Sequence, residues 1–240
     1  MTADTDPANP DSTQTDATER PTPRWMRTIM AGGVVVAVLL LGASLGLLVQ
    51  LNRGPAQPDA ASVDVGFSQD MSVHHRQAVL MAGLARDRST DLALKSLAFD
   101  IERTQLEQVG RMQGWLSLWN AAPVATGPAM HWMTHESMPG MTHGSGPSAT
   151  GPLSMPGMAS PAELDQLRAA GGKDFDVLFL KLMLRHHQGG LPMAKYAAEH
   201  AETAQVRNLA EKIVVAQSAE SDYLTKLITE RGAAPFPAPI

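Results

Sequence analysis

The stretch HHRQAVLMA at residues 74–82 returns, 112 residues later, as HHQGGLPMA at residues 186–194. When the chain is aligned with itself at that offset without gaps, the agreement continues on both sides of the histidine pairs. The matched positions are Phe67 with Phe179, Met71 with Met183, Met81 with Met193, Leu97 with Leu209, Ile101 with Ile213 and Gln105 with Gln217. This repeat predicts two copies of one helical hairpin, packed as a four-helix bundle about a pseudo-twofold axis.

The composition around the repeat favours an all-α fold. Aromatic residues are scarce at 5%, while Ala and Leu, which favour helices, are abundant. The first hairpin is expected over 63–120, with its turn at RDRSTD, residues 86–91. The second hairpin is expected over 160–232, and residues 233–240 should form a tail. Its expected helices are a short one capped by Ser160 and Glu163, followed by long ones over 175–200 and 203–231.

The N-terminal part of the chain predicts a membrane segment. No charged residue occurs between Arg27 and Arg53, and the 23 residues 29–51 are almost wholly apolar. A helix of that length spans roughly 35 Å, which is enough for the hydrocarbon core of a bilayer. We expect a disordered tail at 1–24, a transmembrane anchor at 25–52 and a linker at 53–62. The alternative is a cleaved export signal, although signal cores are usually only about 7–15 residues long.

The basic residues around this segment indicate its orientation. Arg20, Arg24 and Arg27 precede it, whereas only Arg53 follows closely, so the N-terminus should stay in the cytoplasm and the main domain should be exported. Gly42 and Gly46 form a G-x-x-x-G pattern that could pair two anchors into a homodimer.

Several classes of function are excluded by composition and motif. The net charge of −5 argues against a nucleic-acid partner, and the absence of cysteine excludes thiolate zinc sites and cysteine nucleophiles. No histidine has an acidic residue three positions before it, as di-iron carboxylate bundles require, and no H-E-x-x-H occurs. We find no serine triad, phosphate loop or paired catalytic carboxylates. The chain is therefore not expected to be an enzyme, and a redox copper enzyme is the remaining alternative.

Each histidine pair belongs to a stripe along one helix face. Residues at i, i+3, i+7 and i+10 share a face, and both copies place Met, His, a small residue and Met at that spacing. The second histidine of each pair lies about 100° around the helix from the first. If both stripes face inward, the bundle centre holds up to four imidazoles and four thioethers. These candidate ligands are His74, His75, His186, His187, Met71, Met81, Met183 and Met193.

This set of ligands favours copper. Thioether sulfur is soft and suits Cu(I), while imidazole accepts copper or zinc. Gln105 and Gln217 lie on the apolar stripes of the second helix of each hairpin, which should face the histidines. We expect them to be hydrogen-bond partners of the histidines or to support the metal ligands from behind. Because imidazole must be neutral to coordinate, binding by the bundle should fade below about pH 6 while thioether binding persists. The alternative is a structural or protein-interaction module whose core histidines are satisfied by hydrogen bonds.

The motifs also resemble those of a known family. FSQDMSVHHRQAVLMA with QLEQVGRMQGWL, and FDVLFLKLMLRHHQGGLPMA with QSAESDYLTKL, resemble the DUF305 family of exported bacterial proteins over residues 63–232, apart from the central insertion. The resemblance implies a ferritin-like bundle, secreted or membrane-anchored, with functional histidine pairs and copper handling in some members. Two departures stand out. Gln108 replaces the Glu220 of the second copy, and Gly189, Gly190 and Pro192 are expected to interrupt and kink the second histidine helix. Glu220 joins the two glutamines as a residue expected behind the ligands.

The insertion at 121–159 repeats the same ligand types. Its AMHWMTHESMPGMTHGSGPSATGPLSMPGM, residues 129–158, holds six of the fourteen methionines. Gly, Pro, Ser and Thr predict a flexible segment whose sulfurs stay out of the core and collect soft metal with lower affinity. The alternatives are a biased linker or an adhesive surface for apolar partners. The candidate secondary ligands are Met130, His131, Met133, His135, Met138, Met141, His143, Met155 and Met158.

Overall fold

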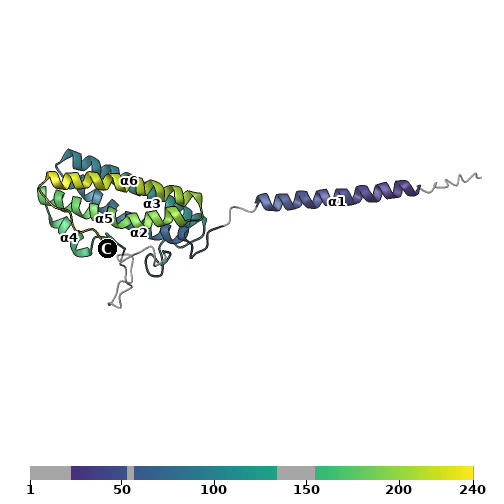
Figure 1. Ribbon diagram of the computed structural model, residues 1–240, viewed down its shortest axis with the longest axis horizontal. Helices are drawn as coiled ribbons and strands as arrows, with labels where there is room; N and C mark the ends of the chain where they lie inside the picture. The colour runs from purple at the N-terminus through teal and green to yellow at the C-terminus, as the bar shows by residue number, and fades with distance from the viewer. Residues whose placement is uncertain (1–22, 53–56, 134–154, 240) are drawn as a thin grey trace, which may run out of the picture. The chain divides into compact units, whose positions relative to one another are not determined.

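The computed structural model describes residues 23–52, 57–133 and 155–239, and their regular structure is entirely helical (Figure 1). The helices are α1 (Arg24–Asn52), α2 (Val63–Arg88), α3 (Leu92–Leu118), α4 (Pro161–Ala169), α5 (Gly172–His200) and α6 (Ala204–Glu230). The predicted all-α fold is confirmed. The chain divides into two units, residues 1–56 and 57–240, which are described separately.

The first unit contains α1, which is long and apolar enough to cross a membrane by length and composition. An export signal near an N-terminus would meet the same description. Gly42 and Gly46 lie on this helix, and pairing through them stays a prediction. The tail predicted at 1–24 falls almost wholly outside the described residues.

The second unit consists of two helical hairpins. Helix α2 packs along α3, α5 packs along α6, and the two histidine helices, α2 and α5, contact each other between the hairpins. The short helix α4 lies against α5 (Figure 1). The repeat in the sequence is thus a repeat of hairpins, with the histidine pairs on the two helices that meet.

Side-chain caps fix where several of these helices begin. Ser62 accepts a hydrogen bond from Val65 N at the start of α2, and Thr203 does the same for α6. The predicted capping box is present at α4, where Ser160 and Glu163 each bond the backbone of the other. Such caps are each worth about 1 kcal/mol and stop the helices from fraying into the loops.

A buried carboxylate joins the two hairpins at one end. Asp64, with no exposed surface, accepts hydrogen bonds from Glu202 N at 2.7 Å and Thr203 N at 2.9 Å. This contact places the start of α2 beside the connection between α5 and α6. The two histidine helices therefore run antiparallel, which fits a pseudo-twofold axis perpendicular to them.

The core has two apolar clusters, and the histidines occupy α2 and α5 between them. One cluster contains Met81 and Met183 together with Phe175, Phe179 and Leu94. The other contains Met71 and Met193 together with the buried ends of the insertion. Since the histidines of α2 fall between Met71 and Met81 along the helix, they form a polar layer within an apolar interior.

Candidate metal centre

All four paired histidines are fully buried where α2 meets α5. His74, His75, His186 and His187 have no exposed surface. The rings of His74 and His186, which are equivalent in the repeat, lie face to face with centroids 3.8 Å apart and planes tilted by 36°. The other histidine of each pair is more distant, with ring centroids 6.4 Å apart in α2 and 6.3 Å apart in α5.

The same ring nitrogen, Nε2, makes a hydrogen bond in every one of these histidines. His74 Nε2 lies 3.1 Å from the carbonyl oxygen of Pro156, and His186 Nε2 lies 2.9 Å from the backbone oxygen of His74. His75 Nε2 lies 2.7 Å from Gln108 Oε1, and His187 Nε2 lies 2.6 Å from Glu220 Oε2. Because these oxygens accept, Nε2 carries the hydrogen and donates it.

The other ring nitrogen, Nδ1, is buried without a hydrogen-bond partner among the described residues in all four histidines. The side-chain oxygen and nitrogen of Gln105 and of Gln217 are in the same condition. Buried polar atoms are nearly always paired, and each unpaired one costs about 1–3 kcal/mol. A ring that donates through one nitrogen and presents a lone pair on the other is oriented as metal-bound histidines are.

Burial also keeps the rings of His74, His75 and His186 uncharged near neutral pH. Desolvation lowers the pKa of His74 to about 4, although its hydrogen bond to Pro156 opposes the shift. Desolvation, reinforced by the positive charge that His74 would carry, lowers the pKa of His75 to about 3. The pKa of His186 is lowered well below its ordinary value for the same reasons. Near neutral pH these three Nδ1 atoms are therefore lone-pair donors.

The two halves of the repeat differ in the residue that accepts the hydrogen bond from the second histidine of each pair. Gln108, 33 residues after His75, is a neutral partner that is 8% exposed. Glu220, 33 residues after His187, is an acidic partner whose side chain is 24% exposed. The polar layer therefore reaches the protein surface through a carboxylate on the α6 side.

Two glycines make room for the site within α5. A Cβ at Gly190 would lie 3.0 Å from His74 Cε1 and 3.1 Å from Gln217 Oε1. A Cβ at Gly189 would lie 2.2 Å from the carbonyl oxygen of Pro156, which is closer than the two atoms can approach. The helix nevertheless continues unbroken from Gly172 to His200 through Pro192, so the expected interruption is wrong. The two glycines allow the backbone at Pro156 and the side chain of His74 to pack closely against α5.

The four stripe methionines are fully buried but do not gather around one point. Met71 and Met193 belong to one apolar cluster, whereas Met81 and Met183 belong to the other. In the described part of the chain, no three His, Asp or Glu side chains are grouped so that they could hold a metal ion together. The structure thus places donors on both sides of the histidine layer without a complete cage.

The first end of the insertion packs into the core. Asp70, which is 3% exposed, accepts hydrogen bonds from Met130 N at 2.7 Å and Trp132 Nε1 at 2.8 Å. Desolvation raises the pKa of Asp70, and these hydrogen bonds oppose the shift. Met130 and Met133 are buried, so the prediction that the sulfurs of the insertion avoid the core is wrong for both.

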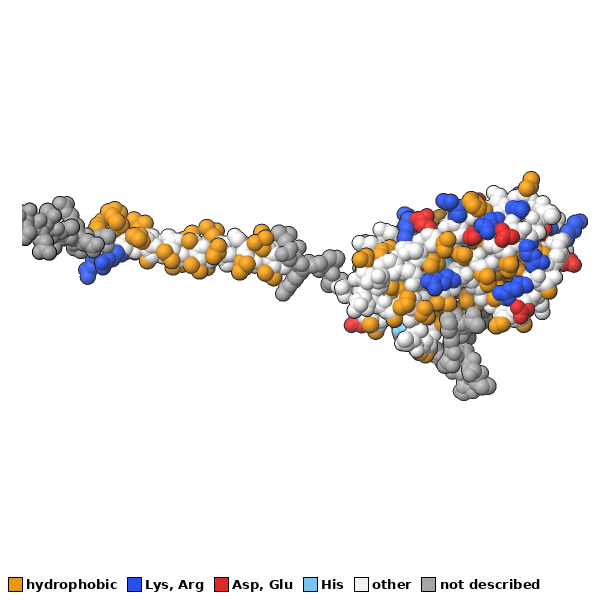
Figure 2. All heavy atoms as spheres, turned by 180° about the vertical axis from the view of Figure 1, so that it is seen from behind, with side chains coloured by type: hydrophobic (Ala, Val, Ile, Leu, Met, Phe, Trp, Pro, Cys, Tyr) orange, Lys and Arg blue, Asp and Glu red, His pale blue; other side chains and the backbone are white. Residues whose placement is uncertain are grey.

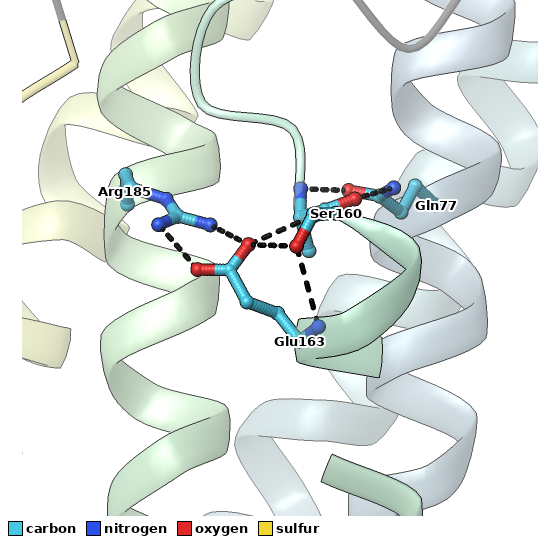
Figure 3. A network of polar contacts seen from close by, with 5 residues as sticks. Gln77, Ser160, Glu163 and Arg185 are labelled. Atoms are coloured by element: carbon cyan, nitrogen blue, oxygen red, sulfur yellow. Dashed lines mark hydrogen bonds and ion pairs between the residues drawn. The ribbon is translucent and has the colours of Figure 1, made fainter. Parts of the chain in front are cut away.

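The second end of the insertion is held by the polar network of Figure 3. Gln77 donates to the backbone oxygen of Ala159 at 2.9 Å and accepts from its nitrogen at 2.6 Å. Glu163 binds both terminal nitrogens of Arg185, at 2.7 and 2.8 Å, and also caps Ser160 (Figure 3). These contacts fix the backbone at Ala159 and Ser160, shortly after the Pro156 whose carbonyl oxygen lies 3.1 Å from His74 Nε2.

The remaining residues of the insertion differ in position. Met155 is buried, which corrects the prediction for a third sulfur, and Met158 is partly buried. His131 is exposed, and its Nδ1 lies 3.1 Å from the carbonyl oxygen of Pro128. His135, Met138, Met141 and His143 lie outside the described residues.

Several residues of the site were not identified from the sequence. The carbonyl oxygen of Pro156 and the carboxylate of Asp70 carry no pattern that a helical repeat would show. Gln108 was noted only as a departure from Glu220, yet the equal spacing from His75 to Gln108 and from His187 to Glu220 marks both as histidine partners. This equal spacing is the feature of the sequence from which the two histidine partners could have been predicted.

Comparison with known proteins gives a consistent assignment. The family described as "Domain of unknown function (DUF305)" matches residues 64–228, while no curated protein matches. A DUF305 protein from Streptomyces coelicolor is 39% identical, with 75% of this chain and 99% of that chain covered and a TM-score of 0.65. A DUF305 fragment from Deinococcus radiodurans is 30% identical, with 74% and 99% covered and a TM-score of 0.57. CopM in its Cu(II)-bound form is 28% identical, with 70% and 97% covered and a TM-score of 0.52.

Proposed function

Because this chain belongs to the DUF305 family, which has no assigned function, we propose from its own buried donors that it binds copper outside the cytoplasm. The proposed role is copper buffering, delivery or tolerance. The observation that carries the proposal is the set of four buried Nδ1 atoms that have no partner among the described residues, while Nε2 is held by a hydrogen bond. A bound ion would remove the cost of leaving these acceptors unpaired.

The types of donor favour copper over other metals. The histidine layer lies between buried methionines, and a set of neutral imidazole and thioether ligands suits Cu(I) better than hard cations such as Mg²⁺. CopM, a structural neighbour, has been solved in Cu(I)-bound, Cu(II)-bound and Ag-bound forms. This similarity supports the choice of metal for this chain, with zinc as the alternative.

The proposal assigns each group of residues a different task. The histidine pairs are the principal ligands, and Met71, Met81, Met183 and Met193 are soft co-ligands that move toward a bound ion. Gln108 and Glu220 orient the outer histidines through Nε2. The partly exposed carboxylate of Glu220 gives a cation a polar approach to the layer. In the insertion, His131 and Met158 are the described residues that remain suited to collecting metal.

The proposed localisation rests on the length and flanking charges of α1. We assign this helix as an uncleaved anchor with its N-terminus in the cytoplasm, because arginines precede it and the apolar run is longer than a usual signal core. The bundle then faces an oxidising compartment, where thioethers persist as ligands although thiols would be oxidised.

A second function is favoured by one observation, the lack of a three-residue His, Asp or Glu cage among the described residues. In that account the bundle is a scaffold for a protein partner, and the stacked histidines are structural. The two accounts differ in whether copper changes the stability of the protein.

Competition for Cu(I) tests the proposal. The full chain in detergent, kept anaerobic, should remove at least one equivalent of Cu(I) from a coloured chelator. Bound ion should also raise the unfolding temperature, because a ligand at 100 times its Kd stabilises the folded state by about 2.7 kcal/mol. Copper that stays with the chelator, together with an unchanged unfolding temperature, would leave only the scaffold account.

A further inference from the structure

One end of the bundle carries an exposed apolar patch that the copper site does not use. It consists of Trp115, Leu118, Trp119 and Val124, at the end of α3 and in the turn that follows. Leu118 is 74% exposed and Val124 is 36% exposed. The two half-buried indoles are stacked, with ring centroids 6.3 Å apart and planes tilted by 25°. We call these four residues the tryptophan patch.

The patch lies in a long stretch without charged residues. Between Arg111 and His131 the chain contains no Asp, Glu, Lys or Arg. Figure 2 shows a similar division on the face that it draws: charged side chains crowd one end of the domain, and white and orange ones cover most of the other. A surface of this kind can leave water without the cost of desolvating a charge.

The connection to α1 ends beside this patch. Gln57, the first residue of the second unit, has its Nε2 3.5 Å from the backbone oxygen of Leu118. Only residues 53–56 separate Gln57 from the last residue of α1, so the connection spans at most about 17 Å. Helix α3, with 27 residues, is about 40 Å long, so its two ends differ greatly in how close they must stay to α1.

We propose that the tryptophan patch rests in the interfacial layer of the bilayer that holds α1. This inference depends on the proposal that α1 is an uncleaved anchor. Tryptophan concentrates at membrane interfaces because its ring is apolar while its N–H can reach water or headgroups. The patch adjoins Gln57, which at most about 17 Å of chain joins to the end of α1, so it meets that layer at high effective concentration and weak apolar contacts suffice.

Charges near the patch indicate that the attraction is apolar. Asp59 lies in the segment before α2, and Glu199 and Glu202 lie beside the connection between α5 and α6, which Asp64 holds at this end of the bundle. These acidic residues would not favour anionic headgroups, and Arg207 is engaged with the backbone oxygens of Ala201 and Glu202. Docking should therefore be insensitive to salt.

The absence of native cysteine permits a clean test with two matched variants. Leu118→Cys places a nitroxide label in the patch. Leu92→Cys places the same label at the other end of α3, where Leu92 is 82% exposed. The full chain is reconstituted in phosphatidylcholine vesicles. The label at 118 should be several-fold less accessible to a water-soluble nickel complex than the label at 92, and more accessible to lipid-soluble oxygen. The difference should persist at about 1 M salt, where the screening length is about 3 Å.

The outcomes separate this inference from the copper proposal. Equal nickel accessibility at the two positions would overturn docking, and so would protection of position 118 from both reagents, because a protein surface would then cover it. Cu(I) uptake is measured on the same two samples. Copper binding without membrane protection removes only the docking inference, and protection without copper binding removes only the copper function.

Discussion

Replacing His74 and His186 together by glutamine should weaken Cu(I) binding on the order of 100-fold or more while the fold is retained. Glutamine places an N–H group near the position of a histidine Nε2 but offers no counterpart of Nδ1 as a ligand. The donors to Pro156 and to the backbone oxygen of His74 are thus preserved, and only the proposed ligands are lost. Loss of residues that merely support a ligand costs 10–100-fold in affinity, so loss of two ligands should cost at least that much.

Competition with a Cu(I) chelator measures this effect, and circular dichroism checks the fold. The matched control changes the exposed His200 to glutamine, which alters an imidazole outside the core and outside every proposed ligand set. Affinity unchanged in the His74/His186 variant, with the helical signal intact, would show that the central pair is not a ligand pair.

Acidification should unfold the metal-free protein well above the pH at which its buried histidines would be protonated in the folded state. In the unfolded chain these rings have a pKa near 6.5, whereas folding lowers the pKa of His74 to about 4 and of His75 to about 3. Their stabilising effect is complete above pH 6.5 and is lost as the pH falls below it, because the unfolded state then binds protons that the folded state excludes. At pH 5 the loss is about 2 kcal/mol for each of these two rings.

Urea unfolding of the metal-free chain at pH 7.5 and pH 5 measures this loss. The variant with glutamine at His74 and His186 should lose less stability between the two values, since it lacks two of the groups responsible. A wild-type free energy of unfolding that is equal at both pH values would contradict the burial of neutral rings. The sequence predicted that copper binding fades below about pH 6 because the imidazole ligands become protonated. The structure indicates that binding would instead fade because the metal-free protein unfolds.

The hairpins and their ends could be predicted because local physical rules determine them. The offset of 112 residues, the capping box at Ser160 and the turn near residues 86–91 each depend on residues close in sequence. The resulting helices agree with the predicted ones to within a few residues. Periodicity also indicated that the histidine face would meet another helix, because burial of a repeated apolar stripe requires a partner.

The contacts of the insertion could not be predicted in the same way. Asp70 and Gln77 bind backbone groups of residues 130 and 159, and a backbone group has no sequence signature. Gly189 and Gly190 suggested a broken helix because glycine is unfavourable inside helices, but the close approach of Pro156 and His74 outweighs that local preference. Packing between segments distant in sequence thus determines the contacts of the insertion and the continuity of α5, which local rules did not predict.

The central claim concerns one atom in each ring, and long-range ¹H–¹⁵N NMR correlation of the histidine side chains observes it directly. The metal-free protein should show hydrogen on Nε2 and an unprotonated Nδ1 in His74, His75 and His186. On addition of Cu(I), which is diamagnetic, Nδ1 signals in the layer should shift strongly while Nε2 keeps its hydrogen. Rings that carry hydrogen on Nδ1, or Nδ1 signals that do not move with copper, would contradict the account.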